Sequence, residues 1–453
     1  MKRYLTRIIL LVIVSCMAIA FISCNRDNGY VVPSFEPGTV LEPKGRIKAT
    51  TYLRSGNDSE IAFDKWIKAY NEIYPNVVVK PDIIEWSALA TKVAAGDIGD
   101  VYYGCEQDVY TYAVTHRAAM ALDAYVDLLG IDITDVFTGL YDLGCANGLL
   151  YMVPSDLNPG VLYTNKTMLA EAGVSMPKMS WNYDEFKSIA KAVTKVNDDG
   201  TIAQCAMNYD TTFPGIMRFM VGFGGNWVDK VNKRLNLVSD ENCLKGVTEL
   251  IELIDKGYVY VSGLTGPAGA KFANISDVSD VAFTGGTYIS RIGMDEQFRL
   301  LGLDMDVINF FEFPAKRVIV GGATGFFVYS KTKNPDAAAT FCCLMLQDAG
   351  QQAFNSTLGG GIPTTKSNYE ADFWKFPLDK EKFNYDAFVC YPEAFIGNWP
   401  DVYTPSEVAK ELNAFATSFY SKHFSNAKDY RDNLRELEEK CNQIWSTLYS
   451  DNG

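Results

Sequence analysis

Histidine is the scarcest functional side chain in this sequence, since 453 residues contain only two, His116 and His423. Two imidazoles leave little room for His-based acid–base catalysis or for a His-rich metal site. Basic residues are also in deficit, because 41 Lys and Arg stand against 55 Asp and Glu, a formal charge of −14. A nucleic-acid binder needs an excess of cations to neutralise phosphates, so we expect no nucleic-acid partner.

Motifs of the common enzyme classes are also missing. The sequence contains no G-x-S-x-G, H-E-x-x-H or G-x-x-x-x-G-K-S/T pattern, and no pair of carboxylates stands out by its context. The eight cysteines that follow residue 24 show no C-x-x-C spacing, which excludes a zinc ribbon and a small disulfide scaffold. We therefore expect no catalytic residue, no metal and no cofactor, and we interpret most of these cysteines as buried free thiols.

Long apolar runs occur only at the N-terminus. Three basic residues precede an apolar stretch at residues 8–23, which is shorter than the ~20 residues of a membrane-spanning helix. A basic start, an apolar middle and a small residue at the end predict a secretory signal peptide over residues 1–23. The alternatives, an ordinary cleaved signal or an uncleaved anchor, would export the chain as well.

The end of this segment predicts a lipid anchor. Residues 21–24 resemble the lipobox of bacterial lipoproteins, in which the cysteine, here Cys24, becomes the lipidated first residue. Cys16 fits the same pattern and is the alternative, although the apolar region before it is short. Residues 24–45 combine the lipidated cysteine with a proline- and glycine-rich tether. Removal of residues 1–23 leaves 38 basic and 55 acidic residues, so we expect an extracytoplasmic chain of charge −17 that lipid holds at a bacterial membrane.

Strand and helix patterns alternate along the rest of the chain. Apolar residues recur at helical spacing over residues 63–74, between strand-like runs at residues 47–52 and 77–79. Trp66 lies on this apolar stripe, which assigns it to the core. A second stripe over residues 430–448 predicts a long C-terminal helix. Strand–helix–strand units of this length are typical of a parallel sheet, so the pattern predicts an α/β fold.

Local signals also place several boundaries. Asn182 and Glu185 form a capping-box pattern, which predicts a helix that runs through Val196. Residues 149–153 and 161–163 have the composition of two strands on either side of a kinked segment that contains two prolines. We therefore expect the chain to bend between them.

Three segments, in matching order and spacing, carry a family resemblance. The first is the helix and strand of residues 63–79, followed by Ala-Gly-Asp at residues 95–97. The second, residues 148–186, contains the runs Gly-Leu-Leu-Tyr-Met-Val-Pro, Leu-Tyr-Thr-Asn-Lys and Trp-Asn-Tyr-Asp-Glu-Phe. The third joins residues 321–341 to Gly-Ile-Pro at residues 361–363. Together they resemble the extracellular solute-binding proteins of bacterial ABC importers, in particular the large sugar-binding family, and the resemblance covers nearly all of the mature chain.

The resemblance implies a two-lobed periplasmic-binding-protein fold of the α/β class, with hinge crossovers between the lobes. It implies crossings near residues 155–158, 283–288 and 321–325, which are rich in residues that can absorb the dihedral changes of closure. It divides the chain into an N-terminal lobe, residues 46–155 and 287–321, and a C-terminal lobe, residues 158–283 and 325–453.

The resemblance also implies a function. The protein would capture a carbohydrate-like solute in the cleft between the lobes and deliver it to the permease subunits of an ABC importer, as a monomer that touches the membrane only through its anchor. The alternative is an exported glycoside hydrolase or another carbohydrate-active enzyme, for which two of the 55 acidic residues would suffice. A surface adhesin or structural lipoprotein is a third possibility, against which the α/β alternation without repeats argues.

A sugar site requires flat aromatic rings and forked polar groups, so loop residues near strand ends are the candidates. Trp227 and Trp399 follow glycine-containing loops and belong to no helical stripe. Core packing or a solvated surface position is the alternative for each candidate. The predicted ligand-binding residues are Arg54, Asn57, Trp86, Glu106, Asp156, Trp227, Gly286, Tyr288, Gly322 and Trp399.

Overall fold

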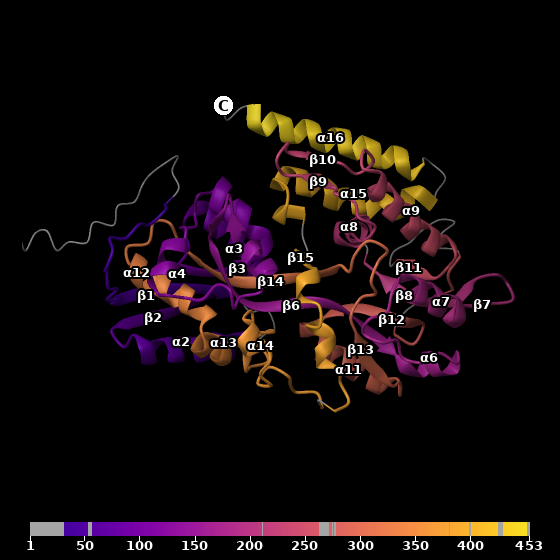
Figure 1. Cartoon of the computed structure of the whole chain (residues 1–453), viewed down its shortest axis with the longest axis horizontal. Helices are drawn as coiled ribbons and strands as arrows, with labels where there is room; N and C mark the ends of the chain where they lie inside the picture. The colour runs from indigo at the N-terminus through magenta and orange to yellow at the C-terminus, as the bar shows by residue number, and fades with distance from the viewer. Residues whose placement is uncertain are drawn as a thin grey trace, which may run out of the picture.

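Two long strands run through the middle of the molecule and link its two lobes (Figure 1). They are β6 (Met152–Asn165) and β14 (Ile319–Val328). The structure is a computed structural model, and it describes residues 31–52, 57–210, 212–261, 271–273, 275, 278–379, 381–397, 400–424 and 429–450. The predicted signal peptide and its lipidation site, Cys24 or Cys16, lie outside the described residues.

The two strands lie at the centre of a sheet that contains eleven of the described strands. The first half of β6 pairs antiparallel with β14, and its second half pairs antiparallel with β12 (Val281–Thr287) and β13 (Met305–Ile308). The predicted crossings near residues 155–158 and 321–325 lie within β6 and β14. A further short strand, β15 (Phe395–Gly397), pairs parallel with β14 where the chain returns to the second lobe.

The first lobe is built on three parallel strands, β1 (Gly45–Tyr52), β2 (Val77–Ile84) and β3 (Val101–Cys105). The stripe predicted at residues 63–74 forms helix α2 (Asn57–Ile73), whose Trp66 and Tyr70 are fully buried against Phe341 of α12. The assignment of Trp66 to the core is therefore confirmed. The other helices of this lobe are α3 (Trp86–Ala95), α4 (Asp123–Leu128), α5 (Thr138–Leu143), α12 (Pro335–Cys343), α13 (Asp348–Asn355) and α14 (Lys366–Tyr369).

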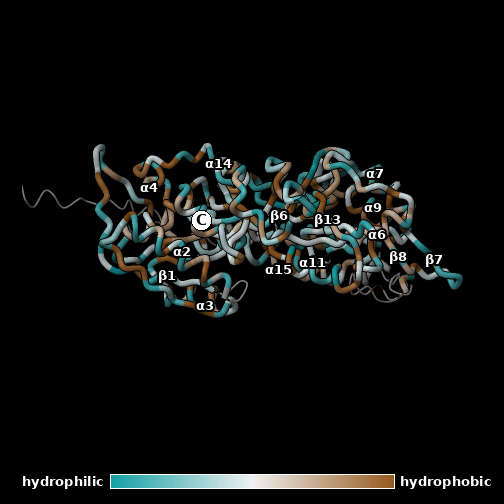
Figure 2. Tube along the Cα trace, turned by 90° about the horizontal axis from the view of Figure 1, so that it is seen from below, coloured by the Kyte–Doolittle hydropathy of each residue, from teal (hydrophilic) through white to brown (hydrophobic). Residues whose placement is uncertain are grey.

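The second lobe places β8 (Ile202–Tyr209) and β11 (Val259–Val261) beside β12, in parallel. Trp181 is buried at its centre and donates from Nε1 to the carbonyl oxygen of Asn309, 2.9 Å away. Figure 2 shows α7, α9 and β8 at the end of the molecule opposite α2 and α4. The helices of the second lobe are α6 (Lys166–Glu171), α7 (Tyr183–Val193), α8 (Phe213–Gly222), α9 (Glu241–Asp255), α15 (Ser406–Phe424) and α16 (Tyr430–Ser450). Helix α11 (Arg291–Leu300) packs its Phe298 into the buried cluster of the first lobe.

Short elements complete the described chain. Two hairpins, β4 (Cys145–Ala146) with β5 (Leu149–Leu150) and β9 (Val228–Asp229) with β10 (Arg234–Leu235), lie apart from the main sheet. The strand β7 (Lys195–Val196) pairs with β8. Helical turns are η1 (Glu106–Asp108), η2 (Thr111–Thr115), η3 (Tyr288–Ser290), η4 (Leu344–Leu346), η5 (Tyr385–Phe388), η6 (Pro392–Ala394) and η7 (Pro400–Val402).

The expected bend around two prolines is wrong, because residues 152–165 form one continuous strand. Pro154 and Pro159 lack a donor N–H, and their partners across the pair are Gly325 and Gly321 of β14. A register shift between Thr324 and Gly325 absorbs the local mismatch. Glycine opposite proline, together with this bulge, keeps β6 in the middle of the sheet.

The capping box at Asn182 is confirmed, but the predicted extent of its helix is not. The Asn182 side chain accepts from the N–H groups of Asp184 and Glu185, both at 3.0 Å, while Glu185 accepts from the N–H of Asn182 at 2.9 Å. Helix α7 ends at Val193, because Thr194 is already extended and the two residues after it join the sheet as β7. The C-terminal helix matches its predicted stripe, and Leu434 and Cys441 are fully buried.

Hydrophobic packing divides the chain differently from the predicted lobe boundaries. Residues 337–389, which the prediction gave to the C-terminal lobe, share the buried cluster of the first lobe. Phe310, Phe311 and Phe313, which it gave to the N-terminal lobe, pack in the second. The reason is topological, since β14 carries the chain into the first lobe, and the chain next reaches β13 of the second lobe at Asn384, whose N–H donates to Asp306.

The described cysteines are all free thiols, and Cys205, Cys243, Cys342, Cys343 and Cys441 are buried. Burial therefore confirms the interpretation for most of them. Within the described residues, no helix combines the length and the apolar character that a bilayer crossing demands.

Candidate ligand-binding cleft

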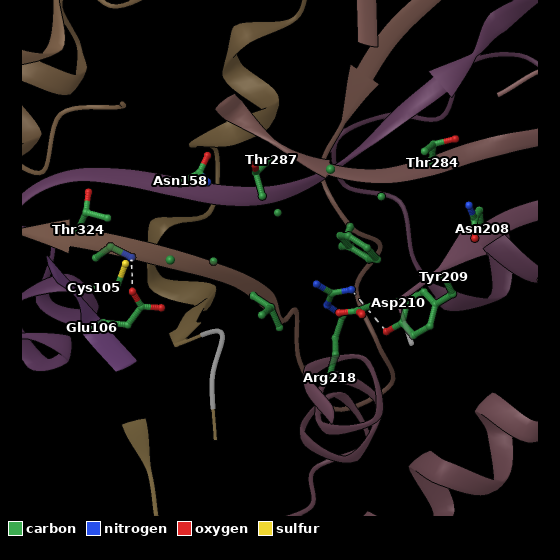
Figure 3. A pocket seen from close by; sticks show the side chains of 18 residues that line it. Cys105, Glu106, Asn158, Asn208, Tyr209, Asp210, Arg218, Thr284, Thr287 and Thr324 are labelled. Atoms are coloured by element: carbon green, nitrogen blue, oxygen red, sulfur yellow. Dashed lines mark hydrogen bonds between the residues drawn. The ribbon is translucent and has the colours of Figure 1, made fainter. Parts of the chain in front are cut away.

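A cavity of about 520 Å³ lies between the lobes, where the crossing strands meet the ends of β3 and β8 (Figure 3). Parallel strands present their carboxyl ends to the same edge of a sheet, and in open α/β sheets ligands bind there. Both lobes contribute walls to this first cavity. Its lining residues are Cys105, Glu106, Asn158, Gly160, Asn208, Tyr209, Asp210, Arg218, Thr284, Gly285, Gly286, Thr287, Phe310, Val320, Gly321, Gly322, Ala323 and Thr324.

Glu106 supplies the charge on the first lobe's wall. It follows β3 directly as the first residue of η1, and only 2% of its surface is exposed. Its Oε2 accepts from the backbone N–H of Ala323 in β14, at 3.0 Å. This bond links η1 of the first lobe to the crossing strand β14, and it fixes the carboxylate at the junction of the lobes.

Arg218 supplies the charge on the second lobe's wall, on helix α8. It is 7% exposed, and its guanidinium lies over the Phe310 ring at 3.8 Å from the ring centroid. One amino group donates to the Tyr209 hydroxyl, 3.4 Å away. Burial raises the pKa of Tyr209 to about 12, although the nearby Arg218 charge opposes this effect. Tyr209 therefore stays a neutral hydroxyl.

Two glycines of β12, Gly285 and Gly286, line the first cavity beside the crossing strand β6. A Cβ on Gly286 would lie 2.7 Å from the Tyr163 ring, so no larger residue fits there without movement of the ring. Gly285 has free space around its Cα, and its backbone reaches the cavity without a side chain in between. A ligand can therefore approach the backbone of β12 closely at this point.

A second cavity, of about 440 Å³, continues the cleft beyond Glu106, which lines both. Tyr110 and Asn147 line it from the first lobe, and Lys230, Lys233 and Trp445 line it from the second. Lys230 follows β9 directly, and its ammonium lies 4.9 Å from the centroid of the Tyr403 ring. The two cavities together form an elongated cleft with one shared carboxylate at its middle.

Three of the predicted ligand-binding residues, Glu106, Gly286 and Gly322, line the first cavity. Trp86 begins α3 and is 43% exposed, with its ring 4.4 Å from that of Tyr52. Arg54 and Trp399 lie outside the described residues, as does the side chain of Asn57, whose backbone begins α2.

The other three predicted residues are buried and do not line either cavity. Asp156 accepts from the hydroxyl groups of Ser155 and Thr324 within the paired crossing strands. Trp227 packs between Phe213 and Tyr403, with ring centroids 5.4 and 5.6 Å away.

Tyr288 is also buried, and its ring lies 3.7 Å from the Arg291 guanidinium carbon. Its hydroxyl donates to the carbonyl oxygen of Trp374. These contacts explain why the side chain does not reach the cleft.

Sequence reasoning missed Arg218, Tyr209 and the lysines of the second cavity. A signal existed for Arg218, because it is the one charged residue in the otherwise apolar helix of residues 213–222. A charge in a fully buried helix needs a partner or a function. The sequence around Lys230 and Lys233 gives no such signal, since only the folding of the β9–β10 hairpin brings these lysines to the cleft.

Two α/β lobes that are joined by crossing strands, with a cleft lined by both, are typical of a two-lobed binding protein. The chain belongs to the bacterial extracellular solute-binding protein family, whose sequence profile matches residues 56–352. The predicted family, fold class and solute-binding role are therefore confirmed. No curated protein sequence matches the chain. The family is described as one of solute-binding proteins.

Solved structures show the same fold at low sequence identity. The sugar-binding protein MalE from Xanthomonas citri has a TM-score of 0.71 at 16% identity, covering 89% of this chain and 98% of that one. The cyclic alpha-maltosyl-1,6-maltose binding protein from Arthrobacter globiformis has a TM-score of 0.68 at 18% identity, covering 89% and 100%. The ABC substrate-binding protein Lmo0181 from Listeria monocytogenes, in complex with cycloalternan, has a TM-score of 0.67 at 16% identity, covering 89% and 99%.

Proposed function

We propose that this protein captures a carbohydrate in the cleft between its lobes and delivers it to the permease of an ABC importer, while a lipid on Cys24 holds it at the membrane. The observation that carries the proposal is the first cavity, whose walls come from both lobes and whose floor is the crossing strands. A solute that contacts both walls binds the closed state better than the open one, and so it shifts the equilibrium toward closure.

The chemistry of the lining supports a sugar. Glu106, Asn158 and Asn208 offer forked polar groups for hydroxyls, and Phe310 and Tyr209 offer apolar surface. The similar structures named above are sugar-binding proteins by description, which favours the same ligand class here. Among the described residues, no cluster of three or more His, Cys, Asp or Glu side chains is placed to hold a metal ion.

The test is a thermal-shift screen of the protein without residues 1–23 against neutral and charged mono- and oligosaccharides. A binder at about 100 times its Kd adds roughly 2.7 kcal/mol to the free energy of unfolding and raises the melting temperature. Chromatography of the recovered sugar separates the two function classes. Intact sugar supports a binding protein, whereas cleaved sugar would establish the glycosidase alternative. The absence of any shift across the whole screen would overturn the carbohydrate proposal.

A further inference from the structure

Three arginines of the described chain are buried, and different partners hold their guanidinium groups. Arg291 donates from Nε to the carbonyl oxygen of Phe376 at 2.9 Å and from a terminal nitrogen to that of Tyr288 at 3.0 Å. Arg317 donates to the carbonyl oxygen of Trp181 at 3.2 Å and lies 3.7 Å from the Glu312 carboxylate. Arg218 has neither a carbonyl nor a carboxylate, and only the Tyr209 hydroxyl accepts from it among the described residues.

Arg218 has a hydrogen-bond donor without an acceptor in the described part of the chain, and the residue lines the first cavity. Its Nε is buried without an acceptor among the described residues, and the side chain lines the first cavity. A buried cation without a counter-ion is unfavourable, so a ligand that supplies the anion gains affinity. The guanidinium fork matches a planar oxyanion on two nitrogens at once. Thr284, which lines the same cavity, also has a buried hydroxyl without a described partner.

Besides Glu106, one further carboxylate lines the first cavity, and it does not neutralise Arg218. Asp210 also lines the cavity, but its two oxygens accept from the N–H and hydroxyl groups of Thr212, at 2.8 and 2.7 Å. Arg218 and Asp210 form no ion pair in the described structure. The charge of Arg218 is therefore left for a bound group.

The second cavity has the same electrostatic character. Lys230 and Lys233 line it from the hairpin of the second lobe, and Trp445, which is 4% exposed, has an indole N–H without a described acceptor. Lys230 lines the second cavity, where desolvation lowers its pKa although the Asp142 charge opposes this effect. A chain of net charge −14 thus places three cations, Arg218, Lys230 and Lys233, along one wall of its cleft.

We propose that the ligand is an acidic oligosaccharide, with one anionic group received by Arg218 in the first cavity and a second received by Lys230 and Lys233 in the second. This inference rests on the proposed function and names its substrate class. The shared chemistry is an anionic oxygen group on a sugar, and a carboxylate or a sulfate would supply it. Glu106, at the junction of the cavities, accepts from the hydroxyl groups of the sugar between the two anionic groups.

The first experiment compares acidic sugars with esterified or neutral ones, by titration calorimetry on the protein without residues 1–23. The probes are di-, tri- and tetragalacturonate, their methyl esters, alginate oligomers, chondroitin sulfate oligosaccharides, and neutral malto- and galacto-oligosaccharides. We expect at least one acidic series to bind about 30-fold or more tightly than its esterified or neutral counterpart. Binding of the galacturonates or alginate oligomers, which carry carboxylates alone, identifies the carboxylate as the source. Chondroitin sulfate carries both groups, so its binding identifies the sulfate only if the uronates do not bind.

The second experiment asks whether Arg218 acts on the ligand or only on the fold. In Arg218→Met, we expect the preference for the acidic sugar to fall about 30-fold or more, while the melting temperature without ligand is unchanged or higher, because an unpaired buried charge is removed. Arg218→Lys keeps the charge without the fork and gives an intermediate loss. The matched control is Arg291→Met, which removes a buried arginine that donates to two backbone carbonyl oxygens, and it should lower the ligand-free melting temperature without a change in sugar preference.

The third experiment tests the second cavity. Lys230→Gln and Lys233→Gln should weaken tri- and tetrasaccharide acids more than the disaccharide. Binding of neutral sugars alone would overturn the inference and leave the carbohydrate function intact, whereas no binding of any sugar would overturn both. A fall in the ligand-free melting temperature of Arg218→Met with an unchanged sugar preference would show that Arg218 is structural, and it would also overturn the inference.

Discussion

Glu106 and Arg218 are both more than nine-tenths buried at the cleft, yet the protein holds them in different ways. A backbone N–H of a crossing strand fixes the Glu106 carboxylate. The Arg218 guanidinium is held mainly by the faces of aromatic rings, which stabilise a cation without satisfying its donors. The carboxylate is thus set in position by a crossing strand, while the guanidinium keeps donors available for a bound molecule.

The buried thiols give a prediction for alkaline pH. Desolvation raises the pKa of Cys205 and of Cys441 from 9.0 to about 12. In the unfolded chain these thiols ionise near pH 9, so the unfolded state loses protons first. Stability is therefore fully retained below pH 9 and falls as the pH rises toward 12.

Urea unfolding at pH 8 and pH 10.5 measures this effect. We expect a lower midpoint at pH 10.5 and a smaller decrease in Cys205→Ala than in the wild type, because one ionising thiol has been removed. At pH 8, a thiol reagent should modify both cysteines slowly in the native protein and rapidly in urea. Rapid modification of all thiols in the native state would contradict the assigned burial.

At the scale of elements, the pairing of β6 with β14 depends on glycine. Gly325 lies opposite Pro154, and a Cβ on it would overlap the carbonyl oxygen of Val153. Backbone atoms in the middle of a sheet cannot move away cheaply. Gly325→Ala should therefore destabilise the protein by about 1–3 kcal/mol and weaken ligand binding, because the strand that crosses the lobes is displaced.

Gly293→Ala is the matched control for this variant. Gly293 is exposed in α11, and a Cβ there would meet no atom within 4 Å. Alanine in a helix interior is favoured over glycine by roughly 0.5–1 kcal/mol, so this variant should be slightly more stable. Chemical unfolding of both variants, followed by far-UV circular dichroism, checks the pair. Equal stability of the two would contradict the tight packing of β14.

At the scale of the whole molecule, the cleft predicts closure. The two lobes are connected by a small number of strand crossings, and the cavity walls come from both sides. A ligand that bridges these walls should draw the lobes together by hinge motion. Small-angle X-ray scattering with and without a saturating sugar is expected to show a smaller radius of gyration in the complex. Superimposable profiles for the free and saturated protein would argue against closure.

The sequence by itself determined the class and much of the local structure. The stripe of Phe63, Trp66 and Tyr70, the capping box at Asn182 and the C-terminal apolar stripe each predicted an element that the structure contains. These signals are local, because periodicity and capping involve residues within one or two turns of each other. Family motifs, read in order along the chain, added the two-lobed fold that matching structures confirm.

Only the tertiary structure decided which residues meet in the cleft and which lobe each late segment joins. Glu106, Arg218 and Lys230 are far apart in sequence, and the crossing of β6, β14 and β15 brings them to one cleft. Trp227 has the loop context of a ligand contact, yet its ring packs between Phe213 and Tyr403. Periodicity records which face of an element is apolar, whereas the neighbour that covers this face is set by long-range strand pairing, which no local pattern contains.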